Sequence, residues 1–312
     1  MEEKTMKKLL CLVLALATVL SMAVLFTSCG EEEPTTAPTK EATAEPTNGS
    51  TAEPTAEATD ASTTEPTDEA TEDSTAKEEL KMVTNAYFAP YEFFEGDQIV
   101  GIDAEIAAAI AQKMGRTLKI ESINFDSIIS SVNAGAADFG MAGITVTEER
   151  LTEVDFSLSY ATGCQMLVVK KDSTLTSLDD LVAYPADEDG NYITEGNTAT
   201  KIGVQLGTTG ALYAEWDGYN AIPYTTANDA IIALKKGDVD CVMIDSAPAQ
   251  NFVNSNEDLR MIDGSEAYIV EEYAICVKKG NEALLNEINA AIVALMEDGT
   301  IDAIIEKYIP AE

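Results

Sequence analysis

The sequence predicts an α/β fold that is divided into two similar lobes. From residue 80 onward, short apolar runs typical of strands alternate with segments whose apolar residues recur at helical spacing. A unit of helix, glycine and strand recurs about 100 residues further along the chain. The stretch 80–312 is long enough for one large domain or for two lobes. Strands separated by helices favour mainly parallel sheets with helices on their faces.

The expected elements follow from this alternation. In the first helix, Ile106, Ile110 and Met114 lie on one stripe, and Gly115 ends the helix. We expect strands at 80–84, 118–123, 139–142, 165–170, 202–205, 241–244 and 273–277. We expect helices at 103–114, 126–133, near 177–181, from about 209, and at 228–236, 282–297 and 300–308.

The recurring unit contains a matched aspartate in each copy. A helix and a glycine are followed by Asp138 in the first copy and by Asp240 in the second, and a buried strand comes next. Such units are common in α/β proteins, so a chance match is the alternative to a structural repeat. If the repeat is structural, Gly143 and Asp245 face each other across a cleft, because ligands bind at the carboxyl ends of strands.

Residues 1–28 have the composition of an export signal. Three lysines precede an apolar run over 9–26, and the five residues LFTSC that end at Cys29 resemble a bacterial lipobox, in which the cysteine is lipidated. An uncleaved membrane anchor is the alternative, since the run approaches the length of a transmembrane helix. Either way, we expect a chain outside the cytoplasm. The lipoprotein reading places it at the cell surface of a bacterium of Gram-positive type.

Residues 29–79 are expected to be the lipidated cysteine and a disordered tether. The stretch 30–79 contains no Leu, Ile, Val, Phe, Tyr or Trp and repeats the tripeptide EPT, so it cannot bury enough apolar surface to fold. The whole chain carries a formal net charge of −36. This charge argues against nucleic acid and against anionic lipid surfaces as partners.

The histidine and cysteine content limits the chemistry. The chain has no histidine, which excludes Ser-His-Asp and Cys-His nucleophile systems and the usual zinc sites. We expect no catalytic residue, metal or cofactor. Cys164, Cys241 and Cys276 lie in apolar, strand-like runs and are expected to be buried thiols. A disulfide between Cys164 and Cys276 is the alternative.

The segment 142–150 (AGITVTEER) carries the strongest functional signal. Its small residues leave backbone N–H groups accessible, Thr147 can cap a helix, and Arg150 then lies in the first helical turn. A cation at that position opposes the helix dipole, so we expect Arg150 to bind a ligand carboxylate through its guanidinium fork. The alternative is a surface ion pair with Glu153 or Asp155.

Three further features follow strands. Asp245 ends a strand and could meet a ligand ammonium, or it could cap the next helix. The turn in 203–210 (GVQLGTTG) lacks the lysine of a P-loop but offers N–H groups for a carboxylate. Phe88 and Phe125 could stack on a ligand side chain, whereas core packing is the alternative and is favoured for Phe93.

In order, these segments resemble the extracellular solute-binding proteins (family 3 type) of polar amino acid ABC importers. The resemblance spans about 80–312 and rests on 84–93, 100–103, 124–126, 142–150, 154–157, 203–210, 239–245 and 297–300. It implies a two-lobed periplasmic-binding-protein fold (type II) with two crossover strands. The first lobe would comprise 80–171 and 272–312, and the second 172–271.

The resemblance also implies the ligand-binding residues. The α-carboxylate would be held by Arg150 and by the backbone of Thr145 and Thr209. The α-ammonium would be held by Asp245, the Gly143 carbonyl and the Thr145 hydroxyl, with Ala142 alongside. The side chain would meet Phe88, Phe125, Asn85, Gln205 and Thr208.

Three departures from the family pattern bear on the ligand. Asn85 stands where an acidic residue is frequent, which predicts a polar but non-cationic ligand. Tyr87 replaces a smaller or acidic residue and leaves the pocket depth open. Residues 184–199 form an acidic insertion to which we assign no function.

We therefore expect the substrate-binding component of an amino acid ABC importer. Its partners would be a free L-amino acid, an ABC permease, and the membrane through the lipid anchor. Closure of the lobes would bury the ligand. The alternatives are a sensor that presents its ligand to a membrane receptor and, on the same fold, a dehydratase, for which we find no general acid.

Overall fold

The computed structural model describes residues 78–181 and 199–310. These residues belong to one compact unit, 71–312. The predictions about the export signal, Cys29, the tether and residues 184–198 of the insertion lie outside the described residues. Within the described ranges, no helix is long and apolar enough to cross a membrane.

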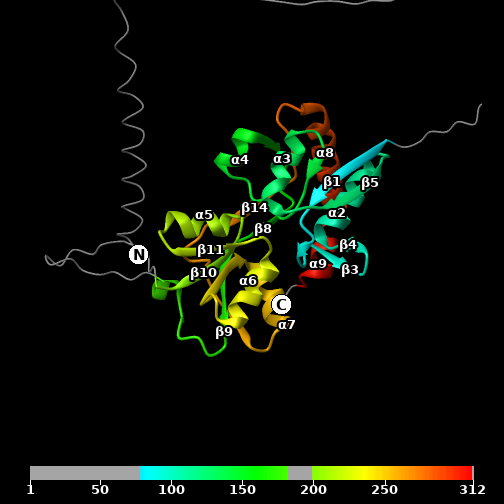
Figure 1. The fold of residues 1–312 in the computed structure, drawn as a ribbon. Coiled ribbons are helices and arrows are strands. Elements are labelled where there is room, and N and C mark those ends of the chain that lie inside the picture. Colours follow the sequence, from blue (N-terminus) through cyan, green and yellow to red (C-terminus); the bar gives the residue numbers. More distant parts are fainter. Residues whose placement is uncertain (1–77, 182–198, 311–312) are drawn as a thin grey trace, which may run out of the picture. The chain divides into compact units, whose positions relative to one another are not determined.

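The first lobe is built around a five-stranded sheet (Figure 1). Its strand order is β5 (Thr117–Ser122), β1 (Glu79–Thr84), β6 (Phe139–Gly140), β15 (Cys276–Lys278) and β7 (Val154–Phe156). One face is covered by helices α2 (Ile102–Lys113), α8 (Glu282–Glu297) and α9 (Thr300–Tyr308), and the other by α3 (Ile128–Asn133). Side chains alternate along β1, so Met82 packs with the first group while Val83 packs against α3.

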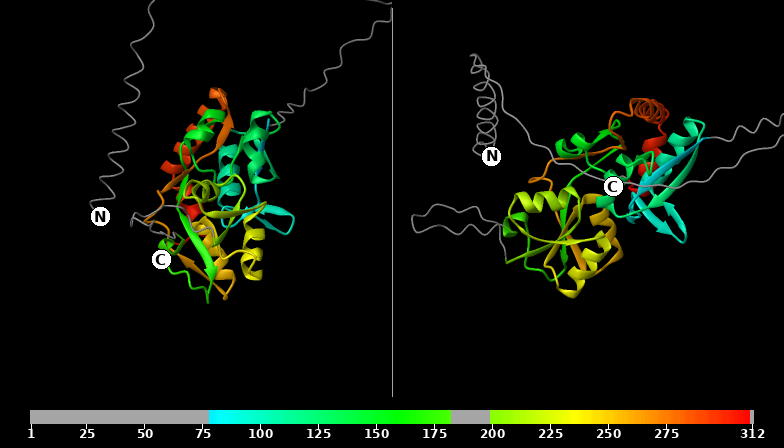
Figure 2. Two further views of the ribbon diagram at one scale, coloured as in Figure 1. Left: turned by 60° about the vertical axis from the view of Figure 1, so that its left-hand side comes forward. Right: turned by 45° about the horizontal axis from the view of Figure 1, so that its top comes forward.

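The second lobe repeats this design. Its strand order is β11 (Asn220–Tyr224), β10 (Lys201–Gln205), β12 (Cys241–Asp245), β9 (Gln165–Lys170) and β13 (Leu259–Ile262). Helices α5 (Thr209–Trp216) and α6 (Ala227–Lys236) lie on opposite faces, with α7 (Ser246–Ser255) on the side of α6 (Figure 2). Met243 of β12 accordingly packs with the α5 cluster, and Val242 with the α6 cluster.

Strand pairing is mixed in both sheets. In the first, β1 pairs in parallel with β5 and β6, whereas β15 is antiparallel to β6 and β7. In the second, β10 pairs in parallel with β11 and β12, whereas β9 is antiparallel to β12 and β13. Parallel pairing thus holds only where helices connect the strands. The α/β class with two lobes is confirmed, but the sheets are mixed rather than mainly parallel.

The internal repeat is structural. The Asp138 carboxylate accepts a hydrogen bond from the Lys81 backbone N–H of β1 at 2.8 Å, and the Asp240 carboxylate accepts one from the Lys201 N–H of β10 at 2.8 Å. Each aspartate thus fixes one strand, β1 or β10, to the segment that enters the parallel strand beside it, β6 or β12. The shared strand order and this shared contact confirm that the lobes are built from equivalent units.

The lobes are connected by a two-stranded antiparallel ribbon. It consists of β8 (Ala161–Gly163) and β14 (Glu271–Tyr273). Because β9 belongs to the second sheet, the chain leaves the first lobe through β8, about one strand earlier than the expected boundary at 171. The expected strand 273–277 is divided between β14 and β15 for the same reason. Its apolar run has no turn signal to mark the change of sheet.

Several local features differ from the expectations. The segment 126–133 begins with a 3-10 turn, η1 (Phe125–Ser127), before α3, and the helix near 177–181 is a 3-10 turn, η2 (Leu178–Leu181). A three-stranded sheet of β2 (Tyr87–Phe88), β3 (Glu92–Glu95) and β4 (Gln98–Val100) was not predicted, nor were the short strands β7, β11 and β13. The three described cysteines are free thiols, so Cys164 and Cys276 do not pair.

Candidate functional site

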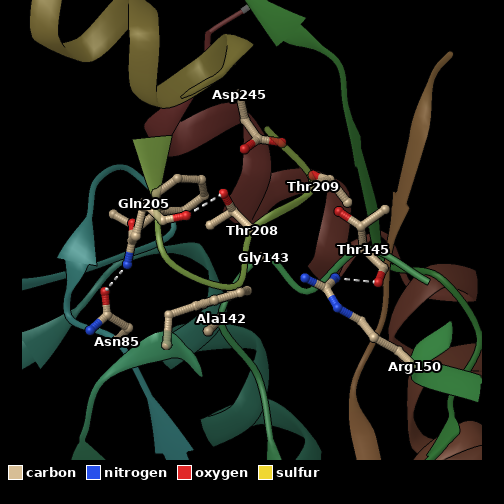
Figure 3. Close-up of a pocket in the computed structure, with 11 residues that line it drawn as sticks. Asn85, Ala142, Gly143, Thr145, Arg150, Gln205, Thr208, Thr209 and Asp245 are labelled. Atoms are coloured by element: carbon tan, nitrogen blue, oxygen red, sulfur yellow. Dashed lines mark hydrogen bonds between the residues drawn. The ribbon is translucent and has the colours of Figure 1, made fainter. Parts of the chain in front are cut away.

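A cavity lies between the lobes. The segments that follow β1, β6, β10 and β12 converge on it, as expected for the carboxyl ends of parallel strands. Eleven residues line it: Asn85, Phe88, Phe125, Ala142, Gly143, Thr145, Arg150, Gln205, Thr208, Thr209 and Asp245. These are the eleven residues predicted to contact a ligand, and Figure 3 shows how their side chains are arranged. That each contacts a ligand stays a prediction.

Arg150 is held in the cavity wall by its own segment and by the other lobe. Helix α4 (Glu148–Glu153) begins after Thr147, whose hydroxyl accepts from the Arg150 backbone N–H at 3.2 Å. The buried guanidinium donates from Nη1 to the Thr145 carbonyl at 2.6 Å and from Nη2 to the Gly207 carbonyl at 2.9 Å. It also lies 5.5 Å from the centre of the Phe125 ring.

The alternative of a surface ion pair is wrong for Arg150. Its side chain is only 7% exposed, and no described carboxylate lies within 4 Å of it. Asp155 instead pairs with Lys279 at 2.8 Å. Burial lowers the pKa of Arg150, while the nearby carboxylates of Glu271 and Asp245 oppose that shift. A buried cation paired only with carbonyl dipoles is suited to a ligand anion.

Asp245 supplies the opposite charge. It is the last residue of β12 and the N-cap residue of α7, yet its side chain makes no capping hydrogen bond. Oδ1 instead accepts from the Tyr273 hydroxyl at 2.5 Å. Burial and the repulsion of Glu271 raise the pKa of Asp245 to about 7. None of the described residues forms an ion pair with this carboxylate, and a ligand ammonium would provide the cationic partner.

The two amides at the far end of the cavity connect the lobes. Gln205 of the second lobe donates from Nε2 to Asn85 Oδ1 of the first lobe at 3.1 Å, and Asn85 Nδ2 donates to the Ile123 carbonyl at 2.7 Å. Figure 3 shows this pair on the opposite side of the cavity from Arg150. Thr208 caps α5 by accepting from the Ala211 N–H at 3.3 Å. The cavity therefore has a charged end and an uncharged polar end.

Comparison with known proteins identifies the family. The model of the bacterial extracellular solute-binding proteins, family 3, matches residues 80–311. The chain belongs to this family. The arginine-binding extracellular protein ArtP of Bacillus subtilis is 31% identical over 241 residues, which cover 76% of this chain and 88% of ArtP.

Solved structures agree with this assignment. The substrate-binding protein of an amino acid ABC transporter has a TM-score of 0.67 and 31% identity, covering 75% of this chain and 100% of that one. An ancestral arginine-binding protein bound to glutamine has a TM-score of 0.66 and 33% identity, covering 75% and 98%. The two-lobed fold is that of the periplasmic amino acid-binding proteins. The chain is an extracellular solute-binding protein and not an enzyme.

Two acidic residues of this solute-binding protein were missed by the sequence reasoning. Glu271 of β14 is 1% exposed and lies behind the cavity wall. Asp103 is fully buried, and its Oδ2 accepts from the Gly143 N–H at 2.8 Å and from the Tyr160 hydroxyl at 2.9 Å. Burial raises the pKa of Asp103 to about 7. Their contacts join residues far apart in sequence, so no local pattern identified either role.

The expectation of core packing is not met for Phe93, which is half-buried and belongs to none of the core clusters of the described residues. Phe88 and Phe125 line the cavity, whereas Phe93 packs edge-on against Tyr308 with ring centres 6.3 Å apart. Gly143 has φ +54°, and a Cβ there would lie 3.0 Å from the Phe88 ring. Glycine at this position therefore allows the chain to turn tightly beside the ring.

Proposed function

We propose that this solute-binding protein is the substrate-binding component of an amino acid ABC importer, and that its interlobe cavity captures a free, polar, non-cationic L-amino acid. The observation that carries the proposal is the opposition of two buried, unpaired charges in one cavity, Arg150 from the first lobe and Asp245 from the second. A zwitterionic amino acid carries a carboxylate that matches Arg150 and an ammonium that matches Asp245. ArtP is an arginine-binding extracellular protein, and the similar solved structure is the substrate-binding protein of an amino acid ABC transporter, which supports the same ligand class and transport system.

The α-carboxylate would bind at the Arg150 end. A guanidinium fork that already meets two carbonyls keeps further N–H donors for a planar anion. Thr209 is the first residue of α5, and backbone N–H groups in a first helical turn have no partner within the helix. The backbone N–H groups of Thr145 and Thr209 would complete the carboxylate site.

The ligand side chain would extend toward Asn85 and Gln205, with Phe88 and Phe125 against its apolar part. Asp245 is the only carboxylate among the described residues that line the cavity. A second cationic group on the ligand would therefore be buried without a countercharge, which is unfavourable. This favours a polar, uncharged side chain, in contrast to the arginine named for ArtP.

Thermal-shift screening of the twenty amino acids, followed by calorimetry, tests this proposal. We expect polar, uncharged L-amino acids to stabilise the protein at one site and Arg150→Ala to abolish binding. Arg116→Ala is the matched control, because Arg116 pairs with Glu78 and Glu287 outside the cavity. Unchanged affinity in Arg150→Ala would contradict the carboxylate site. Equal or tighter binding of arginine or lysine would contradict the specificity.

We also propose that the chain is anchored to the outer side of the cell membrane through lipidation of Cys29. The support is the LFTSC segment that ends at this cysteine. One acyl chain anchors weakly, whereas several anchor firmly. Cys29→Ala should release the protein into the culture medium, and retention of that variant in the membrane fraction would favour an uncleaved anchor.

A further inference from the structure

Glu271 lies at the junction of both lobes and the cavity. It belongs to β14, one of the two strands that connect the lobes, and its side chain is buried. It does not line the cavity itself. A carboxylate in this position has no direct part in the proposed ligand contacts, so its hydrogen bonds indicate what it does.

Three side chains surround the Glu271 carboxylate. Oε2 accepts from the Thr145 hydroxyl at 2.5 Å and from the Thr209 hydroxyl at 2.8 Å, and Oε1 accepts from Gln165 Nε2 at 3.0 Å. Thr145 belongs to the first lobe, whereas Thr209 and Gln165 belong to the second. One carboxylate thus holds a cavity-lining hydroxyl from each lobe.

This arrangement determines the direction of the two hydroxyl groups. Each hydroxyl has a single proton and directs it at Glu271 Oε2. The Thr209 oxygen also accepts from Gln165 Nε2 at 3.2 Å, but no described residue donates to the Thr145 oxygen. Thr145 therefore presents only lone pairs to the cavity, and these suit an N–H donor.

We propose that Glu271 is a positioning residue that makes the Thr145 hydroxyl a hydrogen-bond acceptor for the α-ammonium of the ligand. This inference rests on the proposed function. Without Glu271, the Thr145 proton is free to turn into the cavity, where it would oppose an ammonium group. Glu271 thereby selects amino acids over carboxylic acids of the same shape that lack the amine.

The test uses the full chain, the amino acid found by screening, and its analogue with hydrogen in place of the ammonium. Glu271→Ala should weaken binding of the amino acid about tenfold or more and leave binding of the analogue within about threefold. Thr145→Val should likewise weaken binding of the amino acid and leave binding of the analogue within about threefold. The double variant should bind the amino acid within about twofold of the weaker single variant, because both changes remove one contact. Equal losses for both ligands, or additive losses, would overturn the proposal.

A second variant covers the case in which Glu271→Ala does not fold. In Glu271→Gln, the amide oxygen can still accept from both hydroxyls, and the Gln165 amide turns so that its Oε1, which has no hydrogen-bond partner among the described residues, accepts from the new nitrogen. We expect this variant to bind the amino acid within about fivefold of the wild type, and a larger loss would overturn the proposal. Amino acid binding by the wild type tests the proposed function separately. If the wild type binds the amino acid but the variants do not show the expected losses, only the role of Glu271 is refuted.

Discussion

The guanidinium of Arg150 donates to the carbonyl of Gly207 at 2.9 Å, so a side chain of the first lobe is bonded to the backbone of the second beside the cavity. The same group bonds the Thr145 carbonyl at 2.6 Å. Two carbonyls at fixed positions orient the guanidinium plane before any ligand arrives. This geometry requires a planar fork rather than a single point of charge.

Arg150→Lys should therefore fail to replace the wild-type residue. A lysine ammonium cannot reach both carbonyls and bind a carboxylate at two points, so we expect a loss of about 10–100-fold in affinity for the amino acid. Calorimetry measures this loss, and Arg116→Lys is the control on the surface. An affinity within about twofold of the wild type would show that charge alone is sufficient.

Ligand affinity should fall in acid because of Asp245. Its pKa is raised to about 7 in the unliganded protein, and an ammonium ligand requires the ionised form. Below pH 7 the free protein must lose a proton to bind, so affinity should decrease by up to about tenfold for each further pH unit. Calorimetry in buffers of different ionisation enthalpy should detect proton release. Asp245→Asn should bind weakly without this pH dependence, and stronger wild-type binding in acid would refute the assignment.

The buried Asp103 should lower the stability of the unliganded protein as the pH rises. An aspartate whose pKa is lowered by folding has the opposite effect on stability. Its pKa is raised from 3.8 to about 7 in the folded protein, so the folded state binds the proton more tightly than the unfolded state. The stabilisation is fully present below about pH 3.8 and is lost as the pH rises through 7. Asp103→Asn should remove this pH dependence of stability, because the amide does not titrate. Its oxygen can still accept from the Gly143 N–H and the Tyr160 hydroxyl.

Denaturant unfolding at pH 5 and pH 7.5 measures the effect. We expect the free energy of unfolding of Asp103→Asn, relative to the wild type, to be higher at pH 7.5 than at pH 5. Asp155→Asn is a useful control, because Lys279 and the Gly280 N–H lower the pKa of Asp155 below 3.8, so its contribution to the free energy of unfolding does not change between pH 5 and pH 7.5. A difference between Asp103→Asn and the wild type that does not change with pH would refute the buried-acid account.

Gly143→Ala should lower both stability and affinity. The backbone there has φ +54°, which costs an alanine about 1–2 kcal/mol, and the added Cβ would press on the Phe88 ring. Gly135→Ala isolates the backbone cost, because Gly135 has φ +73° with nothing within 4 Å of an added Cβ. Thermal unfolding should show a loss in both variants, whereas ligand affinity should fall only in Gly143→Ala.

Elements with strong local signals were predicted almost to the residue. Asn281 caps α8 by accepting from the Leu284 N–H, and Gly299 precedes α9 in a left-handed conformation. Both helices have their expected bounds, because caps and helical spacing are local properties. The eleven cavity residues were also predicted, since the family resemblance fixed their positions in order along the chain.

Contacts between distant segments could not be predicted in this way. Glu271 meets Thr145 across 126 residues, and Asp103 meets Gly143 across 40, with no periodic pattern to connect them. For a related reason, the sequence did not predict that β9 belongs to the sheet of the second lobe. An apolar run of six residues specifies a buried strand but not the partner with which it pairs.

The connection through β8 and β14 also dictates an order of assembly during synthesis. The strands of the second lobe all lie within one continuous stretch, from Gln165 to Ile262, so that sheet can form as soon as this stretch is available. The first sheet needs β15 between β6 and β7, and β15 is made more than a hundred residues after β7. The lobe that begins the folded region is thus the last to be completed, and a chain truncated before Cys276 would leave it with an open sheet.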